Sequence, residues 1–394
     1  MRHLIFFLLL FLPFTSVFGS NEKPVRMKLG YANELTIGTH LPAFPYDGRA
    51  GISMGTIADE GNGLASVYFS AENTVVPPLL MFPPFSFARV EIYPNDLVGW
   101  IDFCSGEAEL DFDARFVPMV FGIAMPELSV VTGLTTGIST GQSKQLEGVP
   151  MNGFGDINLV GVAQVPKTDD PVVDWLLQLP NDAATDMLAH WDFPQGKFPC
   201  PTGNSDQPPS VKLTIDPGAK LKISRWPTFK YDALGASVEA VVNWQSSSLV
   251  HVSFPADQIN IPPLKLLGTK VPGGIGVLIE THGLQGTIDV CSGEVLLDFD
   301  ATFTPYLFGR IWDTGVQVRT QLTTDNEQHG SPLLTASEID EWGDGYLAGV
   351  AQVPMSEDDI INRFLRLPSE ALAELPAHID VTGIEADCAE PGML

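Results

Sequence analysis

The feature that most constrains this chain is an internal repeat. Six short blocks of sequence occur twice, in the same order. The two copies of each block lie 185 to 188 residues apart, so few residues were inserted or lost. Such a pattern indicates duplication of a whole domain. The clearest blocks are IDFCSGE at 101–107 against IDVCSGE at 288–294, LDFDA at 110–114 and at 297–301, and GVAQVP at 161–166 and at 349–354.

The repeat divides the chain into two domains of ordinary size. The first domain is expected over residues 20–193 and the second over residues 211–394. Residues 194–210 are rich in proline, glycine, serine and asparagine, which is typical of a linker. This predicted linker also carries Cys200.

Residues 1–19 have the pattern of a secretory signal peptide. A basic start is followed by an apolar run at residues 4–12, and small residues at 17–19 predict cleavage after Gly19. The apolar run ends at Pro13, well short of the roughly 20 residues that a membrane span needs. We therefore expect a secreted or periplasmic protein without a transmembrane segment.

The four cysteines follow the repeat and predict disulfides in an oxidising compartment. Pairing Cys104 with Cys200, and Cys291 with Cys388, would make each domain self-contained. Each bond would close a loop of nearly 100 residues, worth about 4–5 kcal/mol if the stabilisation is entropic. The alternative Cys104–Cys291 pairing would tie the two domains together.

Most of each copy has the alternating pattern of half-buried strands. In residues 109–116 the side chains of Leu110, Phe112, Ala114 and Phe116 fall on one face, and charged side chains fall on the other. The equivalent residues 295–303 repeat this alternation. The fold class is therefore mainly β (α+β), and each domain is an antiparallel β-barrel or a curled sheet or sandwich.

Each copy is expected to close with a pair of short helices. Apolar spacing predicts a first helix at residues 172–177 and at 360–365, with Pro171 in the first turn of the earlier one. Pro180 and Pro368 end these helices. A second helix is expected at 181–188 and at 369–375. The helical pair would cover the apolar face of the sheet, over a packed core or a small cavity.

The net charge of −27 excludes two classes of partner. Nucleic acids and anionic membrane surfaces both repel such a chain. The charge fits a well-solvated surface, or a protein that binds divalent cations. No protein partner or oligomeric state is indicated by the sequence.

One face of the predicted central hairpin is acidic in both copies. A two-residue turn at Ser105 and Gly106 would place Asp102 opposite Glu109, and like charges that oppose each other on a sheet are destabilising. Water, basic neighbours or calcium, which takes six to eight oxygen ligands, would relieve the repulsion. No EF-hand-like loop supports calcium. The candidate cation ligands are Asp102, Glu109, Asp111, Asp113, Asp289, Asp298 and Asp300.

No constellation in the sequence identifies a catalytic centre or a cofactor other than this candidate calcium. The Gly-x-Ser-x-Gly strings at 51–55 and 137–141 precede no helical pattern, so they are interpreted as loops. The histidines and cysteines lack the spacing of zinc motifs. His190 and His378 are repeat-equivalent, and we assign them a structural role at the end of the second predicted helix.

These observations favour a secreted, non-enzymatic binding protein for a small, largely apolar, lipid-like ligand. The ligand would lie in each repeat or between the repeats. One alternative is an acidic structural or matrix protein that binds divalent cations. The other is a hydrolase that acts through paired carboxylates.

Overall fold

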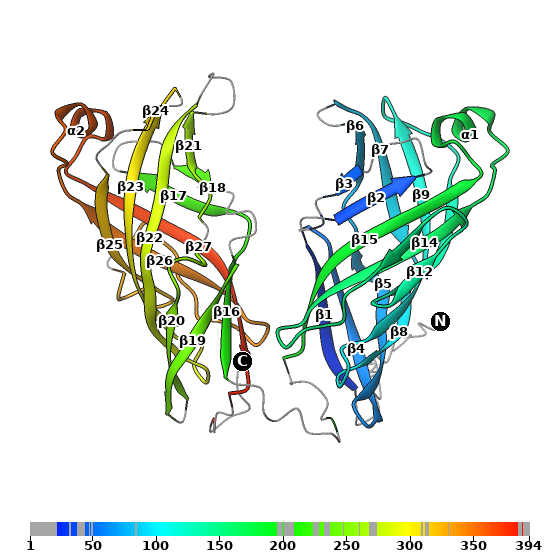
Figure 1. Cartoon of the computed structure of the whole chain (residues 1–394), viewed down its shortest axis with the longest axis horizontal. Helices are drawn as coiled ribbons and strands as arrows, with labels where there is room; N and C mark the ends of the chain where they lie inside the picture. Colours follow the sequence, from blue (N-terminus) through cyan, green and yellow to red (C-terminus); the bar gives the residue numbers. More distant parts are fainter. Residues whose placement is uncertain are drawn as a thin grey trace, which may run out of the picture.

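A computed structural model shows two β-rich domains side by side (Figure 1). The signal-peptide prediction lies outside the described residues, as does most of the predicted linker. The structure describes residues 22–30, 33–37, 44–46, 48, 50–82, 85–194, 200, 209–223, 228–231, 237–246, 248–259, 261–267, 274–308, 310–311, 315–329, 331–384 and 388.

The first domain is a closed ring of eight antiparallel strands. Each strand pairs with its neighbour in the ring, and β1 pairs with β15 to close it. In order around the ring the strands are β1 (Glu22–Leu29), β4 (Ile52–Gly61), β5 (Leu64–Val75), β8 (Leu97–Asp102), β9 (Ala108–Val120), β11 (Leu128–Thr135), β14 (Asp156–Val165) and β15 (Asn181–Asp192).

Shorter strands extend this ring. Two of them add to the outside of β15, three continue the sheet beyond β9, and a separate hairpin follows β11. They are β2 (Asn33–Ile37) and β3 (Phe44–Tyr46); β6 (Leu79–Phe82), β7 (Phe85–Pro94) and β10 (Ile123–Ala124); and β12 (Ile138–Thr140) with β13 (Gln145–Glu147).

The second domain repeats the ring, with β16 pairing with β27 to close it. Its strands in ring order are β16 (Ser210–Ile215), β19 (Ser237–Ser246), β20 (Leu249–Phe254), β22 (Ile275–Asp289), β23 (Val295–Leu307), β25 (Val316–Thr323), β26 (Asp344–Val353) and β27 (Ser369–Thr382). Outside the ring lie β17 (Ala219–Ile223), β18 (Phe229–Tyr231), β21 (Leu264–Leu267) and β24 (Arg310–Ile311).

The two rings differ in one strand. The long strand β22 pairs with β20, β21 and β23. In the first domain the equivalent pairings are divided between two strands, β7 and β8. Otherwise the pairing order is the same in both rings. The mainly β, two-repeat architecture predicted from the sequence is therefore confirmed.

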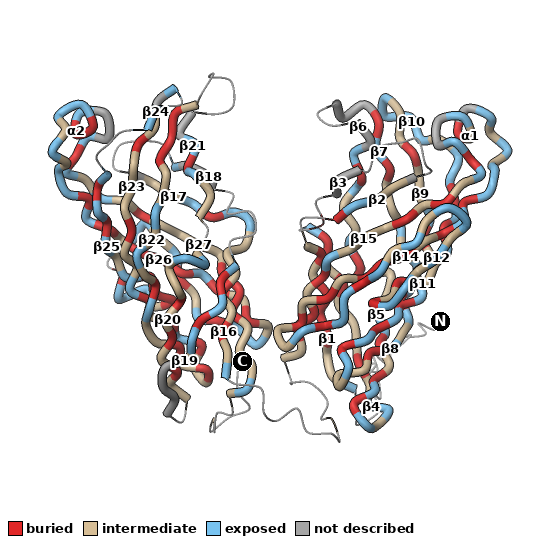
Figure 2. The backbone as a smooth tube through the Cα atoms, viewed as in Figure 1, coloured by how far each residue is buried: buried red, intermediate tan, exposed pale blue. Residues whose placement is uncertain are grey.

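The alternation of side chains places the core inside each ring. In β9 the side chains of Leu110 and Ala114 are buried, whereas Glu109, Asp111 and Arg115 are exposed. Their repeat equivalents Leu297 and Ala301 are buried in β23. Figure 2 shows the same alternation of buried and exposed residues along most strands. Burial of one face of each strand stabilises the ring through the hydrophobic effect.

One helix per domain is confirmed, and the second predicted helix is wrong. The helices α1 (Pro171–Leu177) and α2 (Asp359–Leu365) each insert one buried residue, Val173 or Ile361, into the core. The segments expected to form the second helices lie instead in the closing strands β15 and β27. Pairing on both edges of each closing strand outweighs the local helical spacing around Met187.

The disulfides join Cys104 to Cys200 and Cys291 to Cys388, so the pairing within each copy is confirmed. The two Cα atoms are 5.4 Å apart in both bonds, a normal separation. Disulfides of this kind are typical of extracellular or periplasmic proteins. Within the described residues, no helix has the length and apolar character to cross a bilayer.

Removing one disulfide should destabilise one domain selectively. We expect the double substitution Cys104→Ser and Cys200→Ser to lower the free energy of unfolding of the first domain by about 2–5 kcal/mol, because it releases a long closed loop. Denaturant-dependent hydrogen exchange, which reports on each domain separately, measures this change. The matched variant Cys291→Ser with Cys388→Ser should affect the second domain instead. An unchanged unfolding midpoint in both variants would contradict the prediction.

Candidate functional site

An apolar cavity lies inside the first ring. Its volume is about 120 Å³. It separates two clusters of core residues, one that includes Leu97 and Leu134 and another that includes Val90 and Val130, and all four of these side chains line it. The packing of the first domain therefore leaves a space between two well-packed ends of the ring.

The second ring contains an equivalent cavity of about 150 Å³. Its lining repeats that of the first cavity at matching positions in the duplicated sequence. The clearest repeat-equivalent pairs are Phe112 with Phe299, Phe116 with Phe303, and Ala163 with Ala351. Because the same positions line both spaces, each cavity is a property of the domain fold and not an accident of one copy.

The seven predicted cation ligands are spread along the hairpins of the two rings. Asp102 and Asp289 are turn residues, because each accepts a hydrogen bond from the backbone N–H of the following cysteine, at 2.8 and 2.9 Å. Ser105 and Ser248 donate their hydroxyl hydrogens to the other oxygen of these carboxylates. These two acids thus fix the conformation of the disulfide-bearing turns.

The register of the first hairpin differs from the sequence prediction. Glu109 pairs with Trp100, and Asp102 lies at the turn with its N–H donating to the carbonyl of Glu107. The connection is therefore longer than the predicted two residues, and the side chain of Asp102 caps it. Asp102 and Glu109 are therefore not opposed on the sheet.

The strand acids point away from the core, and three of them have polar neighbours across the sheet. Asp113 accepts from Asn95, Asp298 accepts from Gln321, and Asp300 accepts from Gln317 and Arg319. Glu109 and Asp111 are exposed. In the part of the chain that the structure describes, none of the seven belongs to a group of three or more potential metal ligands. Calcium binding by these acids stays a prediction.

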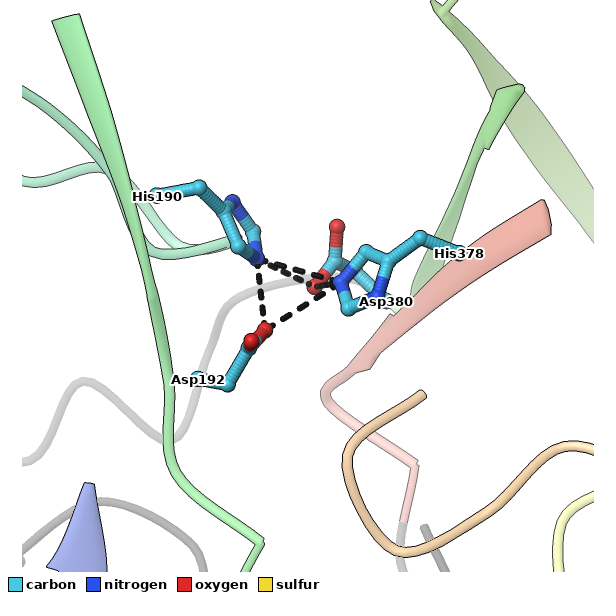
Figure 3. Close-up of side chains that lie close together, drawn as sticks. All are labelled: His190, Asp192, His378 and Asp380. Atoms are coloured by element: carbon cyan, nitrogen blue, oxygen red, sulfur yellow. Dashed lines mark hydrogen bonds and ion pairs between the residues drawn. The ribbon is translucent and has the colours of Figure 1, made fainter. Parts of the chain in front are cut away.

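A different set of polar residues converges where the two domains meet. His190 and Asp192 on β15 face His378 and Asp380 on β27 (Figure 3). One ligand atom from each of the four lies within 4.8 Å of the other three. The Nε2 atoms of the two histidines are only 3.2 Å apart.

Strand geometry explains why each domain offers this pair. Side chains two residues apart lie on the same face of a strand, so His190 and Asp192 project together. The intervening Trp191, 1% exposed, points into the core and packs edge-on against Phe69. In β27 the buried Ile379 plays the same part between His378 and Asp380.

A second carboxylate in each domain holds the outer nitrogen of each histidine. Nδ1 of His190 lies 2.9 Å from Asp156, and Nδ1 of His378 lies 2.8 Å from Asp344. The pairing register explains these contacts, because Asp156 lies directly opposite His190 and Asp344 directly opposite His378. Both imidazoles are therefore held in one orientation, with Nε2 turned toward the other domain.

A glycine before each of these aspartates allows the close approach. Gly155 and Gly343 have φ angles of +93° and +83°, in the region that favours glycine. A Cβ on Gly155 would lie 2.3 Å from the carbonyl oxygen of Trp191, which no side chain could tolerate. The carbonyls of both glycines accept hydrogen bonds from the closing strands. These loops thereby position Asp156 and Asp344.

Cations cross from each domain to the other. Arg26 and Lys28 of the first domain each contact Asp344 of the second at 2.6 Å. Lys212 of the second domain, which is equivalent to Arg26 in the strand register, contacts Asp156 of the first at 2.5 Å. The two histidines are bridged in the same reciprocal way, because His190 contacts Asp380 and His378 contacts Asp192, each at 3.2 Å. The contact between the domains therefore has approximate two-fold symmetry.

One cation breaks this symmetry. Arg26 is 6% exposed, and its guanidinium contacts Asp192 and Asp344, each at 2.6 Å. It also lies over the ring of Trp342, 5.0 Å from the ring centroid. Lys212 occupies the equivalent position in the second copy, because Arg26 lies opposite Asp192 and Lys212 lies opposite Asp380, but the ammonium of Lys212 contacts Asp156. Asp192 therefore has an arginine partner and Asp380 does not.

The carboxylates strongly shift the protonation of the cluster. Burial alone would lower the pKa of His378, but hydrogen bonds to Asp192, Asp344 and Asp380 raise this pKa to about 10. Burial opposes the same rise at His190, where three carboxylates hold the pKa well above its usual range. Burial would raise the pKa of Asp380, yet the two histidines lower it to about 2. Such coupled shifts mark either a structural ion-pair network or a functional site.

Sequence reasoning did not find this cluster. The second helix was placed over the residues that form β15 and β27, so both histidines were assigned to helix ends. One signal was present, because His-x-Asp occurs at 190–192 and again at 378–380. Since the cluster forms only when the two domains meet, no spacing within one copy could reveal it.

Comparison with known proteins adds no family. No protein-family model matches the chain, and no curated protein matches it.

Loss of Arg26 should destabilise the contact between the domains. The substitution Arg26→Met leaves a buried oxygen of Asp192 and a partly exposed oxygen of Asp344 without their partner, and we expect a loss of about 3–5 kcal/mol in the free energy of unfolding. Urea denaturation of the full chain measures this loss. Arg89→Met is the matched control, because Arg89 forms an exposed pair with Glu91 and should change stability by less than about 1 kcal/mol. Equal effects of the two substitutions would contradict the interpretation.

Proposed function

We propose that this is a secreted or periplasmic binding protein for a small, largely apolar ligand, with one binding cavity in each domain. The observation that carries the proposal is the pair of repeat-equivalent apolar cavities. Small-molecule sites are concave and mostly apolar, with a few polar groups that orient the ligand. Both cavities have this character.

The polar side chains at the cavities are few. The polar residues that line the first cavity among many apolar ones are Glu34, Ser53, Thr74, Thr132 and Thr185. Those that line the second cavity are Lys220, Ser237 and Thr320. A ligand with an apolar body and one polar end would satisfy this arrangement. The hydroxyl of a threonine can donate or accept, so it suits several polar ends.

The cavity volumes restrict the ligand class. Spaces of about 120 and 150 Å³ are comparable to an engineered cavity of about 150 Å³ that binds benzene. An aromatic ring, a small terpenoid or the end of an acyl chain is of suitable size. A whole lipid would need part of its chain outside the cavity or an opening of the ring.

The cysteines support a compartment outside the cytoplasm. Two disulfides pin the ends of both domains, as expected for a protein that works in an oxidising environment. The predicted signal peptide supports export. Binding of apolar molecules outside the cytoplasm is useful because water dissolves such molecules poorly.

The other two predicted functions have no comparable support. A calcium-dependent structural role relies on acids that cap turns or pair with neighbouring polar side chains. A hydrolase would need two carboxylates beside a cleft, one of them with a raised pKa. Asp156 and Asp216 line one cleft, and burial raises the pKa of Asp216, but Asp156 is already bound by His190 and Lys212. We therefore keep the binding protein as the proposal.

Filling one cavity should remove one of two binding sites. We expect purified protein to bind two molecules of toluene per chain. NMR chemical shifts of the protein's methyl groups measure this binding. Ala163→Leu should reduce this number to one by occupying the first cavity, and Ala351→Leu should do the same in the second. The double variant should bind none.

Controls separate filling from misfolding. Gln164→Leu adds a similar side chain to the exposed face of the same strand and should leave two sites. Thr132→Leu is a second filling variant, closer in size to the residue that it replaces, in case Ala163→Leu overpacks the core. If folded wild-type protein binds no toluene, and no apolar molecule is found after organic extraction, the proposal fails.

A further inference from the structure

We propose that His190, Asp192, His378 and Asp380 bind one divalent transition-metal ion, with zinc as the best match, and that this ion ties the two domains together. The inference is independent of the ligand cavities. It stands on the geometry, orientation and charge of the cluster between β15 and β27 (Figure 3).

The distances fit a single ion. Four ligands arranged tetrahedrally around zinc, at normal metal–ligand distances, are about 3.3–3.5 Å from one another. Four protein atoms define six such separations here. Five of them are 2.9–3.2 Å, and the sixth, between the oxygens of Asp192 and Asp380, is within 4.8 Å. Small outward movements of the side chains would therefore make room for the ion.

The histidines are oriented for coordination. Asp156 and Asp344 accept hydrogen bonds at Nδ1, so a neutral imidazole in each domain carries its proton there and directs the Nε2 lone pair to the centre. Metal-bound histidines usually show this arrangement, with the second nitrogen bound to a carboxylate or carbonyl. Lys212 and Lys28 hold the outer carboxylates in turn.

The net charge of the cluster favours a cation at its centre. With neutral histidines, the cluster contains the cations Arg26, Lys28 and Lys212 and four carboxylates, a net charge of −1. The lone pairs of two nitrogen atoms and two carboxylate oxygens then face one another across about 3 Å. These groups repel one another unless a cation lies between them. Either one divalent ion or one added proton on each histidine supplies the same charge of +2.

One buried carboxylate of the cluster lacks a partner on the oxygen that faces away from the histidines. Oδ2 of Asp380 is buried and has no hydrogen-bond partner among the described residues. Its equivalent in the first copy, Oδ2 of Asp192, is bonded to Arg26. Buried carboxylate oxygens without a partner are costly, and coordination of the carboxylate to a metal would reduce its negative charge.

The donor set identifies the ion and its role. Two imidazoles and two carboxylates suit zinc, whereas calcium takes six to eight oxygen ligands. A site with four protein ligands has no open position for a substrate, which is typical of structural zinc. Since each domain supplies two ligands, the ion would tie the domains together.

The cluster is accessible to ions from solvent. A cleft of about 510 Å³ that is lined by residues of both domains reaches His190 and His378. A second cleft of about 320 Å³ reaches Asp192 and Asp380 from residues around Trp342. An ion could enter without separation of the domains.

Metal titration of the full chain tests the proposal. The protein is prepared without an affinity tag that binds metal, stripped with a chelator, and titrated with Zn²⁺ in competition with a coloured chelator. We expect one Zn²⁺ per chain, a preference for Zn²⁺ over Ca²⁺, and a higher unfolding temperature with Zn²⁺. The visible spectrum after Co²⁺ loading should show tetrahedral coordination.

Matched variants locate the ion. His378→Gln and Asp380→Asn should weaken Zn²⁺ binding at least 10-fold, and Asp344→Asn, which alters only an outer carboxylate, should weaken it about 10- to 100-fold. His282→Gln changes an exposed histidine outside the cluster and should bind as the wild type does. Circular dichroism confirms that each variant is folded, and Asp380→Asn is the mildest change if the histidine variant does not fold.

Three results would overturn the proposal. Folded wild-type protein that takes up less than one tenth of an equivalent of Zn²⁺ would show that protons alone fill the cluster. Equal Zn²⁺ affinities of His378→Gln and His282→Gln would place the ion elsewhere. Tighter binding of Ca²⁺ than of Zn²⁺ would show that the two histidines are not ligands of the bound ion.

Discussion

The pairing that closes each ring is the constraint on which the rest of the molecule depends. When β15 pairs with β1, its inward face completes the core and its outward face carries His190 and Asp192 to the neighbouring domain. The strand β27 does both tasks in the second ring through its pairing with β16. Core, cavity and domain contact are therefore consequences of the same hydrogen-bonded ladders.

The closed ring also explains why a cavity can persist inside a stable domain. Every strand of the ring pairs with a neighbour on both sides, through one residue pair between β11 and β14 and between β25 and β26 and through longer ladders elsewhere. The shape of the ring therefore does not depend on complete filling of the interior. Small side chains such as Ala163 and Ala351 face the interior where larger ones would fill it. A protein under selection for stability alone would gain from larger residues at these positions.

Much of the fold could be predicted from the sequence, because its signals are local or duplicated. Strict alternation in residues 109–116 identified a strand, and equivalent positions of the cysteines identified both disulfides. The closing strands were mistaken for helices because Met187 and Leu188 lie in a short apolar run without clear alternation. Their strand pairing depends on β1 and β14, which are distant in sequence. The histidine cluster depends further on the contact of two domains, which no pattern within one copy records.

The approximate two-fold symmetry of the domain contact has an evolutionary consequence. A single-domain ancestor could have formed this contact with a second copy of itself, because the same patch serves both sides. In such a homodimer every substitution appears twice, and both partners must change together. Fusion into one chain removes that restriction, and the differences between Lys28 and Thr214 and between Glu34 and Lys220 show the halves drifting apart. One gene can thus encode two cavities with unlike linings, in the manner of a heterodimer whose subunits are always present in equal amounts.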